Sequence, residues 1–138
     1  MFQTIIVADD SLTARMITKR CLEIAGLSDA KFLDARDGAE VLDLARSNKV
    51  DLLVTDLNMP KMDGLSLLKH IKSSPKLSEL PVLVISNTSD ATKSEELLGL
   101  GASAVLGKPV SPIEIAEALE SISKGRIGGM KREKTQVR

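Results

Sequence analysis

The sequence is poor in aromatic residues and carries no net charge. It contains two phenylalanines but no tryptophan or tyrosine, so it lacks the rings on which proteins usually stack bases or planar cofactors. Lysine plus arginine and aspartate plus glutamate number 19 each, which gives a formal net charge of +0. A balanced surface has no general attraction for nucleic acid or for an anionic membrane. We therefore expect this chain to bind neither.

The chain also lacks a cysteine pair and a long hydrophobic run. A single cysteine, Cys21, can form neither an intramolecular disulfide nor a thiolate metal site, and we interpret it as a small buried side chain. The first ten residues contain no basic segment, and their short apolar stretch ends in two acids. That pattern is typical of neither a signal peptide nor a membrane span. A cytoplasmic protein is the resulting expectation.

Short apolar runs alternate five times with longer helical patterns. The runs are rich in Val, Ile and Leu, as expected for strands buried on both faces. Such alternation predicts a doubly wound α/β fold, here a flavodoxin-like (βα)5 three-layer sandwich with a five-stranded parallel sheet of order 2-1-3-4-5. The predicted strands are Thr4–Ala8, Lys31–Ala35, Leu52–Thr55, Val82–Ile85 and Ala104–Leu106.

Helices are predicted between the strands and after the last one. In the first helix, apolar spacing places Ala14, Ile17, Cys21 and Ile24 on the buried face, and Gly26 ends it. The last helix is predicted to end at Ser123, so residues 1–124 form one domain and residues 125–138 a flexible, mixed-charge tail or linker stub. The other predicted helices are Gly38–Ser47, Leu65–Lys72 and Ala91–Leu98.

Polar residues follow the strands at the edge where an open α/β sheet binds its ligands, beyond the carboxyl ends. Acids come at the ends of the first and third strands, which are predicted neighbours, so three carboxylates should meet there. Hydroxyl and amide side chains follow the fourth strand, and a lysine follows the fifth. These residues are Asp9, Asp10, Asp56, Ser86, Asn87, Thr88 and Lys108.

Carboxylates that crowd together repel one another unless a positive charge neutralises them. Taken singly, Asp9 or Asp56 would be read as a cap or turn residue, and Lys108 as a solvated surface lysine. Their joint placement instead indicates a site. Oxygen ligands without Cys or His suit a hard ion, so Mg²⁺ is the predicted cofactor, and Lys108 offers a second positive charge.

The ordered motifs resemble the receiver domain of bacterial two-component response regulators, especially the stand-alone chemotaxis type. The resemblance covers residues 4–123. It rests on the acid pair after the first strand, the run Asp-Leu-Asn-Met-Pro with Asp63-Gly64 after the third, the fourth strand ending in Ser86, and the segment from Gly101-Ala102 to Lys108-Pro109. Each motif alone is weak, but the ordered set on a five-fold βα pattern is specific.

The resemblance implies a phosphorylation site. Asp56 would accept a phosphoryl group from a phosphohistidine on a histidine kinase or phosphotransfer protein, or from a small acyl phosphate. Lys108 would pair with one phosphoryl oxygen, and the Ser86 hydroxyl would donate a hydrogen bond to another. The Lys108–Pro109 peptide is expected to be cis. Slow self-dephosphorylation is expected, without turnover of external substrates.

The resemblance also implies a metal site, in which Mg²⁺ neutralises the repulsion between the carboxylate and the incoming phosphoryl group. Its ligands would be Asp10, Asp56 and the backbone carbonyl of Asn58, with Asp9 helping through water.

The expected output surface is the face formed by the fourth helix, fifth strand and fifth helix. In the family an aromatic on the fifth strand turns upon phosphorylation, but this sequence has Val105, a branched aliphatic, three residues before the lysine. Asn87 stands where Ala is commoner and would narrow access to the phosphoryl group, and Thr88 would either tune dephosphorylation or be a plain loop residue. The face would use Lys93, Val105 and Glu114 to bind a downstream protein, with the chain a monomer or a phosphorylation-dependent dimer.

Three other functions match parts of this pattern. A flavin carrier shares the architecture, but the acids after the first strand would repel its phosphate. A phosphatase with an aspartyl-phosphate intermediate usually carries a second Asp two residues after the nucleophile, where this chain has Asn58. A degenerate receiver that binds partners without phosphorylation is the remaining alternative, and Val105 keeps it open. His70, on the third helix, is interpreted as a surface residue.

Overall fold

The computed structural model describes residues 2–87 and 91–128, with side chains up to residue 124. Within these residues the chain forms a parallel sheet in the order β2-β1-β3-β4-β5. This is the predicted doubly wound topology. The strands are β1 (Thr4–Ala8), β2 (Lys31–Ala35), β3 (Leu52–Asp56), β4 (Val82–Ser86) and β5 (Ala104–Gly107).

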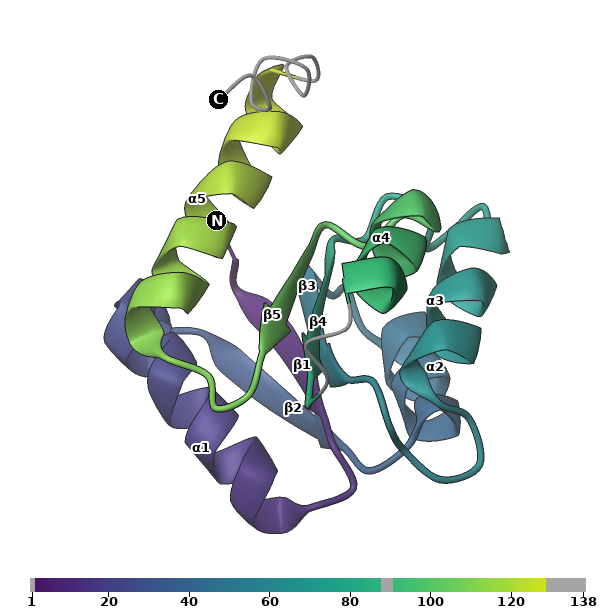
Figure 1. Cartoon of the computed structure of the whole chain (residues 1–138), viewed down its shortest axis with the longest axis horizontal. Helices are drawn as coiled ribbons and strands as arrows, with labels where there is room; N and C mark the ends of the chain where they lie inside the picture. Colours follow the sequence, from purple (N-terminus) through teal and green to yellow (C-terminus); the bar gives the residue numbers. More distant parts are fainter. Residues whose placement is uncertain (1, 88–90, 129–138) are drawn as a thin grey trace.

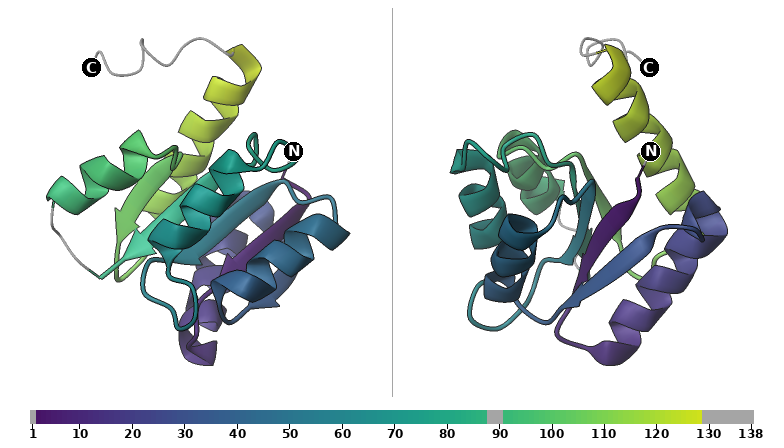
Figure 2. Two further views of the ribbon diagram at one scale, coloured as in Figure 1. Left: turned by 90° about the vertical axis from the view of Figure 1, so that its right-hand side faces the viewer. Right: turned by 180° about the vertical axis from the view of Figure 1, so that it is seen from behind.

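The helices form two layers, one on each face of the sheet (Figure 1). Helices α1 and α5 cover one face, and α2, α3 and α4 cover the other, as the two further views in Figure 2 also show. The helices are α1 (Leu12–Leu22), which continues into a π-helical turn η1 (Glu23–Leu27), α2 (Gly38–Ser47), α3 (Gly64–Ser73), α4 (Ala91–Gly99) and α5 (Pro112–Gly128).

A side chain directly before each of the first three helices caps its N-terminus. Ser11 accepts a hydrogen bond from the Ala14 N–H before α1. Asp37 and Asp63 do the same before α2 and α3. Such caps satisfy backbone donors that the helix leaves without partners. They fix where each helix starts, and therefore the geometry of the loops at the carboxyl edge of the sheet.

The sheet separates two apolar cores. Ile6, Leu53 and Val84 point into the core beneath α2, α3 and α4. Ile5 and Val54 point into the core beneath α1 and α5. All five side chains are at most 1% exposed, as expected of a sheet covered on both faces. A rigid sheet of this kind holds its strand ends in fixed relative positions.

The buried face of α1 differs from the prediction. Cys21 is buried, but Ile17 and Ile24 are 52% and 57% exposed. Arg15 and Thr18 are buried in their place. The prediction was wrong because the apolar spacing assigned polar side chains to the solvent, whereas Arg15 turns inward to meet polar groups at the end of the sheet.

Helix α5 is longer than predicted. Ile115, Leu119 and Ile122 are buried as expected, but the helix continues past Ser123 to Gly128 and projects beyond the sheet (Figure 1). The start of the predicted tail is therefore helical, and residues 129–138 lie outside the described residues. Within the described part of the chain, no helix is long and apolar enough to cross a membrane.

Candidate functional site

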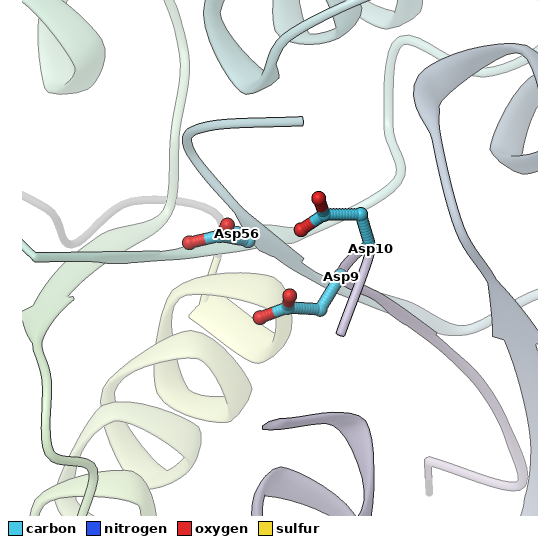
Figure 3. A group of neighbouring side chains, drawn as sticks. All are labelled: Asp9, Asp10 and Asp56. Atoms are coloured by element: carbon cyan, nitrogen blue, oxygen red, sulfur yellow. The ribbon is translucent and has the colours of Figure 1, made fainter. Parts of the chain in front are cut away.

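Three carboxylates meet where β1 and β3 end. Ala8 and Thr55 are partners in the sheet, so the residues that follow them, Asp9 and Asp56, lie side by side. One carboxylate oxygen from each of Asp9, Asp10 and Asp56 lies within 4.8 Å of the others. Figure 3 shows the three side chains reaching into the same space from the ends of these strands. A grouping of this kind could hold a metal ion.

Lys108 completes the cluster from the end of β5. Its Nζ lies 3.1 Å from Oδ1 of Asp56 and 3.2 Å from Oδ2 of Asp9. Its backbone N–H donates to the carbonyl of Ser86 at 2.9 Å, and the Lys108–Pro109 peptide is cis, as expected. The ammonium group thus sits between two carboxylates that come from different strands.

Burial and charge act in opposite directions on these groups. Burial raises the pKa of Asp56, and the neighbouring Asp9 charge adds to this, while Lys108 opposes it without cancelling it. For Lys108, burial alone would lower the pKa, but the carboxylates of Asp56 and Asp9 outweigh it, so the pKa is raised. Three carboxylates therefore lie close together with one lysine between two of them, and this excess of negative charge favours a further positive charge.

The remaining predicted residues surround this cluster. Ser86 ends β4 and is 1% exposed, whereas Asn58 and Asn87 are exposed on the loops after β3 and β4. Pro109 is exposed after the cis peptide. Val105 is half-buried on β5 and packs against the core beneath α2, α3 and α4. Thr88 lies outside the described residues. The roles assigned to these residues stay predictions.

Sequence reasoning missed Arg15 beside the cluster, and it quoted Gly64 as part of a motif without giving it a structural role. The Arg15 guanidinium donates to the backbone carbonyl of Asp9 at 2.6 Å and to Asp34 at 2.8 Å. Gly64 packs so tightly that a Cβ there would lie 2.8 Å from the carbonyl oxygen of Asp56. The only signal for Arg15 was its position one turn into the helix that follows the acid pair. For Gly64 the signal was its place directly after the Asp63 cap.

The raised pKa of Asp56 gives a first prediction. An Asp whose pKa is higher in the folded state is destabilising when ionised, so at neutral pH Asp56→Asn should raise the free energy of unfolding by about 1 kcal/mol. The gain should shrink as pH falls through the folded-state pKa toward the ordinary value of 3.8, since both proteins then carry a neutral group. Urea denaturation followed by circular dichroism measures this.

Asp63→Asn is the matched control for that measurement. Asn caps helices as well as Asp does, and Asp63 lies outside the carboxylate cluster, so this variant should keep wild-type stability. An Asp56→Asn protein less stable than wild type at neutral pH would show that the pairing with Lys108 outweighs burial and repulsion.

The comparisons with known proteins agree on one family. The sequence model of the response regulator receiver domain matches residues 5–120. The chemotaxis protein CheY homolog of Campylobacter jejuni is 36% identical over 121 residues, covering 86% of this chain and 90% of the relative. Chemotaxis protein CheY-3 of Vibrio cholerae is 36% identical over 120 residues, covering 87% and 88%.

Solved structures give the same result. A putative response regulator from Chloroflexus aurantiacus superposes with a TM-score of 0.79 at 27% identity, covering 88% of this chain and 98% of that one. The chemotaxis response regulator CheY4 of Vibrio cholerae has a TM-score of 0.76 at 26% identity, covering 88% and 99%. The chain therefore belongs to the response regulator receiver domain family, whose members act in two-component signalling.

Proposed function

We propose that this chain is a phosphorylation switch in which Asp56 accepts a phosphoryl group from a phosphohistidine on a histidine kinase or phosphotransfer protein. The observation that carries the proposal is the pairing of Asp56 with Lys108 at 3.1 Å inside a cluster of three carboxylates. A buried carboxylate next to one lysine and two further acids has little structural value, but it suits a nucleophile that needs a bound cation.

The transfer itself is a displacement at phosphorus. A carboxylate oxygen of Asp56 forms the new P–O bond while the P–N bond to the donor imidazole breaks, and the imidazole nitrogen keeps that electron pair and takes up a proton. The Lys108 ammonium group, now 3.1 Å from the carboxylate, pairs with a phosphoryl oxygen. The Ser86 hydroxyl donates a hydrogen bond to another. Charge neutralisation and positioning account for such catalysis.

The donor set fits Mg²⁺. The cluster offers carboxylate oxygens and no sulfur or imidazole, which is the preference of a hard ion that keeps several waters. Asp10, Asp56 and the backbone carbonyl of Asn58 would hold the ion, with Asp9 acting through water. When bound, Mg²⁺ offsets the repulsion between the carboxylates and the incoming phosphoryl group.

The output runs through protein contacts on the face formed by α4, β5 and α5. Lys93 on α4, Val105 on β5 and Glu114 on α5 provide a mixed charged and aliphatic surface. Because Val105 is branched and half-buried, it cannot swing between two positions as a ring does. Phosphorylation would therefore shift the packing of the face as a whole. The protein acts in the cytoplasm, as a monomer or as a phosphorylation-dependent dimer, without direct contact to nucleic acid or membrane.

Incubation with acetyl phosphate, followed by intact-protein mass spectrometry, tests the proposal. Wild type with Mg²⁺ should gain one phosphate-sized adduct, and the adduct should vanish with a chelator or in Asp56→Asn. Asp63→Asn, which makes the same substitution at the cap of α3, should be modified like wild type. No adduct in wild type would favour a protein-binding module that works without phosphorylation, whereas an adduct that survives Asp56→Asn would place the phosphate on another residue.

A further inference from the structure

The Asp10 carboxylate is held only through its backbone. Oδ1 of Asp9 accepts a hydrogen bond from the Ser11 N–H at 3.0 Å, and Oδ2 accepts one from the Lys108 Nζ at 3.2 Å. Both oxygens of this carboxylate are therefore fixed. Asp56 is fixed by Lys108. Asp10 is exposed, and among the described residues no group pairs with its carboxylate. The position of this carboxylate therefore depends on the peptide that joins Asp9 to Asp10.

Arg15 is the side chain that holds this peptide. Its Nη1 donates to the carbonyl oxygen of Asp9 at 2.6 Å, and because the peptide unit is planar, this bond also orients the amide nitrogen and Cα of Asp10. The neighbouring peptide is held separately, because the Asp9 N–H donates to the carbonyl of Ala35 at 3.0 Å. Arg15 is 8% exposed, so water cannot easily replace it as the donor.

Asp34 fixes the direction of the guanidinium. Its Oδ2 accepts from the Arg15 Nε at 2.8 Å, and its Oδ1 accepts from the Lys19 Nζ at 2.8 Å. Burial alone would raise the pKa of Asp34, but the hydrogen bonds from Lys19 and Arg15 outweigh it and hold the pKa below its usual value. Asp34 therefore stays ionised as a partner. A planar, forked guanidinium can reach two acceptors at once, which a lysine ammonium at this position cannot do with the same geometry.

We propose that Arg15 is a positioning residue for the metal site: it holds the Asp9–Asp10 peptide so that the Asp10 carboxylate faces Asp56, and Asp34 orients it for this task. The inference rests on the proposed function, because it assigns Arg15 a part in binding Mg²⁺. Groups that orient metal ligands typically change metal affinity by about 10–100-fold when they are removed. Arg15 would orient the backbone peptide that precedes the ligand Asp10, whereas such groups usually orient the ligand side chain itself.

The test compares Arg15→Met and Arg15→Lys with Lys19→Met. The first two remove the donor to Asp9, whereas Lys19→Met removes the other cation from Asp34 and leaves Asp9 untouched. Titration calorimetry with Mg²⁺ should show a dissociation constant about tenfold higher for both Arg15 variants and unchanged for Lys19→Met. In metal-free protein, the NMR amide signals of Asp10 and Ser11 should shift in both Arg15 variants and stay in place in Lys19→Met.

Arg15→Lys distinguishes the proposed role from a purely structural one. This variant keeps a cation opposite Asp34, so under our proposal it should lose less stability than Arg15→Met and yet bind Mg²⁺ just as weakly. If Mg²⁺ affinity follows stability, or if the Asp10 signal does not move, Arg15 only anchors α1 and the inference is overturned. If wild type itself binds no Mg²⁺, the metal in the proposed function fails, and the Asp10 signal alone decides the inference.

Discussion

Gly64→Ala should lower the free energy of unfolding by about 3 kcal/mol, the upper end of what overpacking a well-packed site costs. A Cβ at this position would lie 2.8 Å from the carbonyl oxygen of Asp56 and 2.9 Å from the Cα of Leu57. Both neighbours are backbone atoms, so no rotation of a side chain relieves the clash. The Gly64 N–H also donates a hydrogen bond of 2.7 Å to the Leu57 carbonyl, which holds the two backbone segments close together.

The same substitution should slow phosphorylation, because the backbone that must move carries Asp56, the proposed phosphoacceptor. A displacement near 1 Å at reacting groups lowers rates on the order of a hundredfold. Urea denaturation followed by circular dichroism measures the first effect, and the rate of phosphate incorporation from acetyl phosphate measures the second.

Gly99→Ala is the matched control for Gly64→Ala. Gly99 is the last residue of α4, and a Cβ there meets no atom within 4 Å. Because alanine favours helix more than glycine does, by about 1 kcal/mol, this variant should be as stable as wild type or slightly more so. If the two variants are equally stable, the loop after β3 shifts to make room for the added methyl group at no cost in free energy. The tight contact behind Asp56 would then not contribute to stability.

Mg²⁺ should stabilise the folded protein strongly. A ligand that binds only the folded state at a hundredfold excess over its dissociation constant adds about 2.7 kcal/mol to the free energy of unfolding. The carboxylates of Asp9, Asp10 and Asp56 lie close enough together to bind one ion, and in unfolded protein Asp56 would be far from the adjacent Asp9 and Asp10. Urea denaturation with Mg²⁺ and with a chelator measures the increment.

Asp10→Asn separates metal binding from general salt effects. The Asp10 carboxylate is exposed and has no partner among the described residues, so its neutralisation should leave the metal-free protein as stable as wild type or slightly more stable. The Mg²⁺ increment should disappear in this variant and remain in Asp63→Asn. An increment that is equal in wild type and Asp10→Asn would place the ion elsewhere on the protein.

The sheet could be predicted from the sequence because buried parallel strands are nearly continuous apolar runs. Leu52–Asp56 and Val82–Ser86 are buried throughout, and apolar runs of this length indicate strands because buried helices are usually longer. The cluster of acids followed from the sheet. Once β1 and β3 are neighbours, the residues after Ala8 and Thr55 must lie together, and the topological rule for open α/β sheets places the site there.

The support around the cluster could not be predicted in this way. From the sequence, Arg15 is expected on the solvent-exposed face of an amphipathic helix. Only the folded structure shows that the Asp9 carbonyl and Asp34 accept hydrogen bonds from its guanidinium. Since Arg15 takes the inward direction, Ile17 is left exposed at 52%. Apolar periodicity cannot detect such an exchange, because it scores each residue by its type and not by the polar groups it meets.

The length of α5 was missed for a different reason. Gly125 and the glycines that follow it predicted an end near Ser123, yet the helix continues to Gly128. Glycine disfavours helix by only about 1 kcal/mol relative to alanine, so it lowers the expectation of a helix without forbidding one. Where the domain ends therefore stays a prediction.

Locating the phosphate after treatment with acetyl phosphate and Mg²⁺ tests the central claim most directly. Borohydride converts an aspartyl phosphate to homoserine, and peptide mass spectrometry identifies the residue that has changed. We predict homoserine at position 56 and at no other aspartate, since Asp56 pairs with Lys108 at 3.1 Å, whereas the Asp9 carboxylate is also held by the Ser11 N–H and Asp10 is exposed. Homoserine at Asp9 or Asp10, or phosphate retained on His70 with none on Asp56, would contradict it.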